Sequence, residues 1–113
     1  MKAYFVYIMT NKGRSVLYTG LTNSLMRRVW QHRKGEISGF TRRYNANRLV
    51  YYEQFNDVRN ALAREKQIKG WTRRKKEDLI ATKNPKWTDF AVTILGFGAA
   101  SATYWQERGG CCD

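Results

Sequence analysis

Two short runs of β-branched and aromatic residues, joined by a turn, constrain the fold of this chain more than any other feature of its sequence. The first run covers residues 3–9 and the second covers residues 16–21. Residues 11–14 between them read Asn-Lys-Gly-Arg, a composition typical of tight turns, so the two runs predict a β-hairpin. Tyr7 and Tyr18 belong to the two runs, and we expect both near the middle of paired strands.

An amphipathic helix is predicted directly after the hairpin. Residues 22–24 supply an N-cap, and apolar residues then recur at helical spacing until Gly35 stops the helix. Arg28 and His32 lie one turn apart on the apolar stripe of this helix. Because burying a charge without a partner costs several kcal/mol, their position favours a bound anion such as a phosphate. A pair of snorkelling surface side chains is the alternative.

The remaining elements mix one more strand with two more helices. A third strand is predicted over residues 49–55, a second helix over residues 58–69 and a third helix over residues 73–83, whereas residues 35–48 have loop composition. Glu65 lies in the middle of the inward face of the second helix, where it is either a functional carboxylate or a structural ion-pair partner.

Length and charge indicate one domain that binds a polyanion. The chain has 113 residues and a net charge of +12, and the whole positive excess lies in residues 1–90. With 42% hydrophobic residues the chain can form a core, so it is not a disordered basic tail. A nucleic acid is the natural partner. The predicted phosphate contacts are Arg42, Arg43, Arg48, Lys69, Arg73, Arg74, Lys75 and Lys76.

The end of the chain differs in composition from the rest. The two cysteines are the adjacent Cys111 and Cys112, which cannot form a disulfide framework, and the chain starts without the pattern of a secretory signal, so we expect a cytoplasmic protein. The apolar segment 90–102 is too short to span a bilayer. We expect no integral membrane association; residues 89–113 would form a packed extension or a frayed tail of unknown role. Alternatively, residues 90–105 would dock on a membrane surface or a partner.

The motifs taken together resemble the GIY-YIG nuclease domain, in particular its small standalone bacterial members, the YhbQ-like group. The resemblance covers residues 3–88, so residues 1–88 are taken as the domain. Its motifs are Val6-Tyr7-Ile8, Tyr18-Thr19-Gly20, the helix over residues 25–32, the loop over residues 40–45, residues 64–71 and residues 84–87. The first triplet keeps only the tyrosine of the family pattern, and the second keeps the tyrosine and the glycine.

The resemblance implies an α+β fold, with a small three-stranded antiparallel sheet flanked by about three helices, and a catalytic site on the sheet. By motif position, Tyr7 is the general base, Tyr18 its neighbour at the scissile phosphate and Arg28 the phosphate clamp. His32 is a supporting polar group, and Glu65 is the ligand of one Mg²⁺ or Mn²⁺ ion that binds weakly without substrate. Which tyrosine loses a proton, and whether His32 takes part, stays open.

The predicted function is that of a divalent-metal-dependent endonuclease that hydrolyses phosphodiester bonds, in DNA rather than RNA. A domain this small suggests selection by nucleic-acid structure rather than by sequence, or targeting by a protein partner, and we expect a monomer. The rival prediction is a basic nucleic-acid-binding module without catalytic activity. Bases could stack on Trp30, Trp71 or Trp87, although core packing is the simpler role for these side chains.

Overall fold

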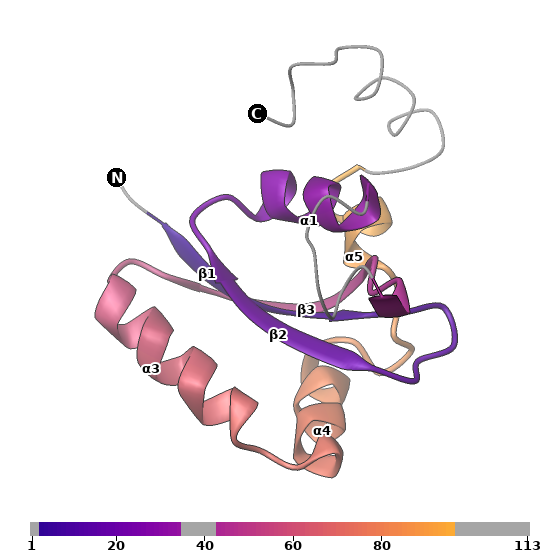
Figure 1. Ribbon diagram of the computed structural model, residues 1–113. Helices are drawn as coiled ribbons and strands as arrows, with labels where there is room; N and C mark the ends of the chain where they lie inside the picture. The colour runs from indigo at the N-terminus through magenta and orange to yellow at the C-terminus, as the bar shows by residue number, and fades with distance from the viewer. Residues whose placement is uncertain (1–2, 35–42, 97–113) are drawn as a thin grey trace.

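The fold is built on a three-stranded antiparallel sheet. The computed structural model describes residues 3–34 and 43–96. Strands β1 (Tyr4–Thr10), β2 (Leu17–Thr22) and β3 (Arg48–Phe55) are arranged in the order β2-β1-β3, so β1 is the central strand (Figure 1). The predicted hairpin is confirmed, because β1 pairs with β2 in the register that places Tyr7 opposite Gly20.

Helices cover both faces of this sheet in the part of the chain that the structure describes. Helix α1 (Leu25–Lys34) and the single-turn α5 (Phe90–Thr93) lie on one face, and α3 (Val58–Lys69) and α4 (Arg73–Lys83) lie on the other (Figure 1). The predicted α+β class is therefore confirmed. The three predicted helices correspond to α1, α3 and α4, whereas α5 was not predicted.

The alternation of side chains along β1 produces two cores. Tyr7 and Met9 point to the face covered by α1, and Val6 and Ile8 point to the face covered by α3 and α4. All four are fully buried, as expected for a central strand that is covered on both sides. The three tryptophans in the described residues also pack in these cores, since Trp30 is buried and Trp71 and Trp87 are half-buried against the second one.

Asp89 joins the segment after α4 to the rest of the domain. Its carboxylate accepts hydrogen bonds from the backbone N–H of Ala91, which caps α5, and from that of Leu49 at 3.1 Å. It also forms an ion pair with Arg33 at 2.9 Å. Upstream, the buried Asn84 donates to the carbonyl oxygens of Val50 and Thr88. Residues up to about the end of α5 thus pack on the sheet.

Two predictions concern the end of the domain and the segment that follows it. The boundary at residue 88 stays a prediction, and residues 97–113 and Arg42 lie outside the described residues. In the described ranges no helix is long and apolar enough to cross a membrane.

The turn between β1 and β2 is held by α4. Arg73, the first residue of α4, donates to the carbonyl oxygens of Ser15, at 2.9 Å, and of Arg14. The Arg14 guanidinium in turn donates to the Lys86 carbonyl and lies 5.5 Å from the centre of the Trp87 ring. Arg73 therefore has a structural role, whatever it contributes to ligand binding.

Candidate active site

Three aromatic rings from three elements meet on the α1 side of the sheet. The Tyr7 hydroxyl oxygen lies 3.0 Å from His32 Nε2, within hydrogen-bond distance. The ring centres of Tyr7 and Tyr18 are 6.3 Å apart, and those of Tyr18 and His32 are 5.4 Å apart. β1, β2 and α1 each contribute one ring, because the register of the hairpin and the start of α1 bring these positions together.

Gly20 makes room for the Tyr7 side chain, and the sequence analysis did not assign it a part in the site. A Cβ atom at position 20 would lie 2.5 Å from the Tyr7 hydroxyl oxygen and 2.6 Å from Cζ. Such distances are far inside van der Waals contact, so only glycine lets the phenol extend across β2. The available signal was a glycine inside a strand, which often marks a close approach of another group.

Arg28 and Glu65 complete the predicted set of five residues. The Arg28 guanidinium is close enough to the Tyr7 hydroxyl to lower the pKa of Tyr7, and the Glu65 carboxylate is close enough for its charge to raise it. Both side chains are half-buried. Because Glu65 comes from α3, on the opposite face of the sheet, the site draws its residues from β1, β2, α1 and α3.

Both members of the Tyr7–His32 pair are uncharged at neutral pH. Burial, reinforced by the neighbouring Tyr18, raises the pKa of Tyr7 well above its usual value of 10, and the opposing effect of Arg28 is smaller. Burial also lowers the pKa of His32 to about 4, and Arg28 adds to this shift. Within the described residues His32 Nδ1 is buried and makes no hydrogen bond. The site thus holds a neutral proton acceptor beside a neutral phenol.

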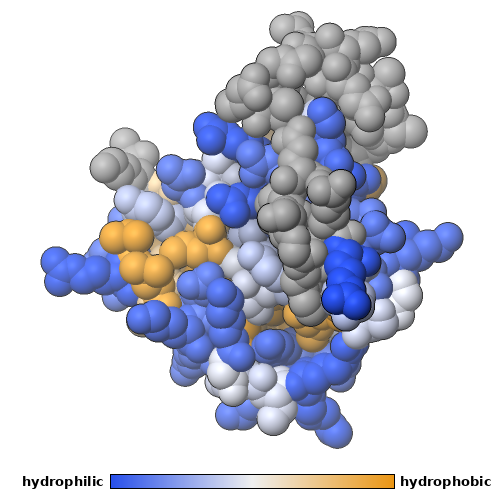
Figure 2. Space-filling view, in the orientation of Figure 1, coloured by the Kyte–Doolittle hydropathy of each residue, from blue (hydrophilic) through white to orange (hydrophobic). Residues whose placement is uncertain are grey.

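A shallow hollow opens to solvent beside Tyr18. It has a volume of about 290 Å³ and is lined by Leu17, Tyr18, Thr19, Lys69 and Lys76. Lys69 Nζ lies 3.3 Å from a carboxylate oxygen of Glu65, so the hollow and the carboxylate share one cation. The viewed face is largely hydrophilic, and its apolar residues gather mainly over the first half of α3 (Figure 2), where Val58 and Leu62 are exposed.

Glu65 fits a sparse magnesium site. No group of three or more His, Cys, Asp or Glu side chains that could hold a metal ion exists among the residues that the structure describes. Mg²⁺ commonly binds through one or two carboxylates and keeps several waters, with substrate phosphates completing the shell. A single half-buried Glu65 beside an open hollow is compatible with that mode, although the Lys69 ammonium group now pairs with this carboxylate.

The other predicted phosphate contacts are spread over the surface. Of those that the structure describes, only Lys69 and Lys76 line the hollow beside Tyr18. Arg73 pairs with Glu77 and holds the hairpin turn, and Lys75 lies 5.4 Å from the centre of the Trp71 ring. Arg43, Arg48 and Arg74 lie elsewhere, with Arg43 and Arg74 exposed and Arg48 half-buried. Their roles in binding stay predictions.

The small α+β domain brings phenols, a guanidinium, an imidazole and a carboxylate together, as the sequence motifs predicted for a domain of the GIY-YIG type. A sequence model described as the GIY-YIG catalytic domain matches residues 3–78. The chain therefore belongs to the GIY-YIG family, as the motifs predicted.

Relatives of similar size support this assignment. A UPF0213 protein of Clostridium perfringens is 43% identical over 90 residues, which cover 80% of this chain and 96% of the relative. A UPF0213 protein of Haloquadratum walsbyi is 42% identical over 67% of this chain and 84% of its own length. The solution NMR structure of a UPF0213 protein from Bacillus halodurans is 32% identical, with a TM-score of 0.51, and the match covers 81% of this chain and 97% of that one.

Proposed function

We propose that this protein is a divalent-metal-dependent endonuclease that hydrolyses phosphodiester bonds in DNA and selects its substrate by structure rather than by sequence. One observation carries the proposal: Tyr7, Tyr18, Arg28, His32 and Glu65 come together from four elements, and Tyr18 also lines a hollow that is open to solvent. Membership of the GIY-YIG family supports it.

Tyr7 and His32 together would move the proton of the attacking water. As the water oxygen forms its bond to phosphorus, its proton passes to the Tyr7 oxygen, and the Tyr7 proton passes to His32 Nε2 at 3.0 Å. A low pKa makes His32 a weak base in the free protein, partly because of the Arg28 charge. A bound phosphate offsets that charge, so substrate binding itself raises the basicity of His32.

Arg28 would hold the scissile phosphate. Its planar guanidinium can donate to two phosphate oxygens at once, and its charge stabilises the additional negative charge of the transition state. A divalent cation on Glu65 would supply further positive charge at the phosphate and at the departing oxygen. The P–O bond to the leaving group breaks as the bond to water forms, and the leaving oxygen takes a proton from solvent.

The basic surface favours selection by structure. Contacts from the exposed cations Arg43, Arg74 and Lys75 to the backbone position a nucleic acid but do not read its bases. The deep position of Tyr7 beside an edge strand favours DNA that is branched, nicked or single-stranded, in which the backbone can approach closely. The proposal extends to a monomer in the cytoplasm, which light scattering and cell fractionation can test.

The rival function is nucleic-acid binding without catalysis, and one observation favours it. In the described structure the Glu65 carboxylate is paired with Lys69. If that pair is permanent, Glu65 cannot serve as a metal ligand, and the +12 chain is only a basic binding module.

Cleavage and binding assays with Glu65→Gln distinguish the two functions. The wild type and the variant are incubated with branched, nicked and single-stranded DNA and the matching RNAs, with Mg²⁺, Mn²⁺ or EDTA. We expect metal-dependent nicking of DNA by the wild type and at least a hundredfold loss in the variant, with binding nearly unchanged. Glu77→Gln is the matched control, since it removes the carboxylate of an ion pair on α4. A wild type that binds but does not nick any substrate above the Glu65→Gln level establishes the rival function.

A further inference from the structure

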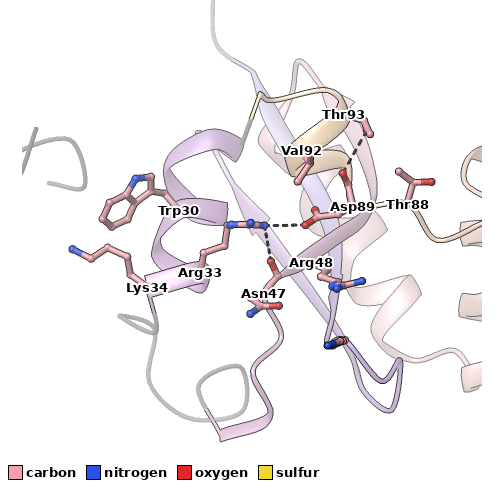
Figure 3. A pocket seen from close by; sticks show the side chains of 10 residues that line it. Trp30, Arg33, Lys34, Asn47, Arg48, Thr88, Asp89, Val92 and Thr93 are labelled. Atoms are coloured by element: carbon pink, nitrogen blue, oxygen red, sulfur yellow. Dashed lines mark hydrogen bonds and ion pairs between the residues drawn. The ribbon is translucent and has the colours of Figure 1, made fainter. Parts of the chain in front are cut away.

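A second and larger cavity lies on another flank of α1. Its volume is about 650 Å³, within the range of about 300–1,000 Å³ that is usual for ligand pockets. The last turn of α1, the start of β3, the turn after β1 and the segment around α5 form its walls (Figure 3). The lining residues are Lys12, Trp30, Arg33, Lys34, Asn47, Arg48, Thr88, Asp89, Val92 and Thr93.

Among the residues that the structure describes, the lining is positively charged, because Asp89, the one acidic residue among them, is fully engaged. One Asp89 oxygen accepts from the N–H groups of Leu49 and Ala91, and the other pairs with Arg33 at 2.9 Å. Figure 3 shows the Arg33 side chain directed at both Asp89 and Asn47. With Arg33 and Asp89 offsetting each other, the cations Lys12, Lys34 and Arg48 leave the lining with an excess of three positive charges.

The positive charges of Lys12 and Arg48 have no evident structural role. Lys34 lies 4.3 Å from the centre of the Trp30 ring and at the C-terminus of α1, where a cation is favourable. By contrast, neither Lys12 nor Arg48 has a side-chain hydrogen bond or ion pair with the described residues. Arg48 is paired with Thr10 at the end of β1, and Lys12 follows two residues later, so the two cations gather at one end of the sheet. Like charges repel, which an anion between them would relieve.

The uncharged polar groups of the cavity also suit an anion. Asn47 and Thr88 add an amide and a hydroxyl to the lining, and Figure 3 shows Asn47 and Arg48 side by side at the start of β3. Such a set is rich in donors, whereas the Asp89 carboxylate, the only one among the described lining residues, is occupied. Phosphate oxygens accept hydrogen bonds and do not donate at neutral pH, so the chemistry matches a phosphodiester.

We propose that this cavity is a second phosphodiester-binding subsite, which holds the nucleic-acid strand a few nucleotides from the bond that the candidate active site cleaves; the inference rests on the proposed function. His32 and Arg33 are consecutive on α1, and they face the active site and the cavity respectively. A helix is about 10–12 Å across, which corresponds to about three or four nucleotides at about 3.4 Å each. One strand passing over α1 would therefore reach both sites.

The salt dependence of DNA binding tests this subsite without requiring cleavage. Anisotropy titrations in EDTA use a single-stranded DNA of twelve nucleotides, with the wild type, Lys12→Ala/Arg48→Ala and Arg59→Ala/Lys66→Ala. The last variant removes one arginine and one lysine from exposed positions of α3, on the other face of the sheet. If Lys12 and Arg48 each contact a phosphate, the slope of log K against log salt falls by about 1.4, whereas the control slope is unchanged. Equal losses in both variants would show a general charge effect and overturn the subsite.

Two further measurements keep the result unambiguous. Arg48 is half-buried, so its replacement could disturb folding. Lys12 is exposed, and the variant Lys12→Glu therefore repeats the test without risk to folding. An unaltered salt slope in this variant overturns the proposal. Amide shifts of Asn47 and Thr88 in NMR titrations separate a strand from a free nucleotide: we expect saturation at far lower concentrations of oligonucleotide than of thymidine monophosphate, and equal affinities overturn the proposal. If Lys12→Ala/Arg48→Ala lowers the salt slope as expected but the wild type shows no metal-dependent nicking, the result contradicts the proposed function and leaves the binding subsite in place.

Discussion

Single residues without reactive groups decide whether the reactive ones can meet. Tyr7 reaches His32 only because position 20 carries no side chain. Tyr7 and Gly20 lie opposite each other in the hairpin. The tyrosine of one motif and the glycine of the other therefore form one steric unit. This coupling gives a physical reason for the presence of glycine in the second motif, beyond its effect on the strand.

Replacement of Gly20 tests this unit. In Gly20→Ala the new methyl group collides with the Tyr7 ring, so we expect a loss of about 1–3 kcal/mol in the free energy of unfolding, together with most of any nicking activity. Gly13→Ala is the control, because a Cβ there would meet nothing within 4 Å. Urea unfolding and the nicking assay measure the two effects. Wild-type values for Gly20→Ala would show that Tyr7 can move without consequence.

Burial of neutral His32 makes stability depend on pH. The pKa of His32 is about 4 in the folded protein and 6.5 without burial, so between these values the unfolded chain binds more protons and stability falls as the pH falls. We expect the free energy of unfolding to drop by about 2 kcal/mol between pH 7 and pH 5, from urea titrations at each pH.

The variant His32→Gln isolates this effect. It should flatten the dependence between pH 7 and pH 5, although its stability at pH 7 is lower because it loses the contact with Tyr7. Titration of Glu53 does not obscure the result. Despite burial, Arg64 and Tyr51 lower the pKa of Glu53 below 4.5, so its contribution to the free energy of unfolding is lost only at more acidic pH. The same slope in variant and wild type would contradict a buried neutral imidazole.

Arg28 should matter more for rate than for affinity. In Arg28→Ala we expect single-turnover nicking to slow by about 10²–10³, as for removal of a group that stabilises transition-state charge, while DNA binding weakens less than tenfold. Arg27→Ala, on the exposed side of the same helix, is the control. Equal losses of rate and affinity would make Arg28 a positioning contact.

At the scale of elements, α3 pairs the Glu65 carboxylate with a cation, Lys69, that lines the hollow beside Tyr18. Glu65 and Lys69 are one helical turn apart, so the Lys69 ammonium group holds the position that a metal ion would take on Glu65. We expect Lys69→Gln to bind Mn²⁺ severalfold more tightly than the wild type without DNA, measured from the electron paramagnetic resonance signal of free Mn²⁺. Lys76→Gln removes the same charge from the hollow without a contact to Glu65, and it should change the affinity less. Equal gains would indicate a general charge effect.

The short α5 is attached to the domain by Asp89 rather than by its own length. In Asp89→Ala the Leu49 N–H and Arg33 lose their partner together with the helix cap, so we expect a loss of about 2–4 kcal/mol in the free energy of unfolding. Asp57→Ala, which removes the N-cap of α3, is the matched control and should cost about 1 kcal/mol. Similar costs in denaturant titrations would show that the tertiary contacts of Asp89 contribute little.

At the scale of the whole molecule, the sequence predicted what local patterns encode. The strands, α1, α3, α4 and the face on which Glu65 lies follow from alternation, helical spacing and caps, all of which act over a few residues. The convergence of Tyr7, Arg28 and Glu65 was predicted only through the family motifs, because contacts between distant elements leave no local pattern.

What the sequence did not predict depends on packing between distant segments. Nothing near Asp89 indicates that it pairs with Arg33, and nothing near Arg73 indicates that it holds the hairpin turn. The basic start of α4, which an anion was needed to explain, has protein partners instead: Glu77 and the turn for Arg73, and the Trp71 ring for Lys75. Such partners become visible only once the elements are placed in space.

The central position of β1 has a consequence for how the site withstands fluctuation. Tyr7 lies on the one strand whose backbone is paired on both sides, with β2 and with β3. In hydrogen-exchange experiments the amides of such a strand open only with the whole domain, whereas edge strands and termini fray on their own. The edge strands can therefore open locally to admit a nucleic-acid strand while the Tyr7 side chain keeps its position. Local opening at the edges thus gives access to the candidate active site without disturbing Tyr7.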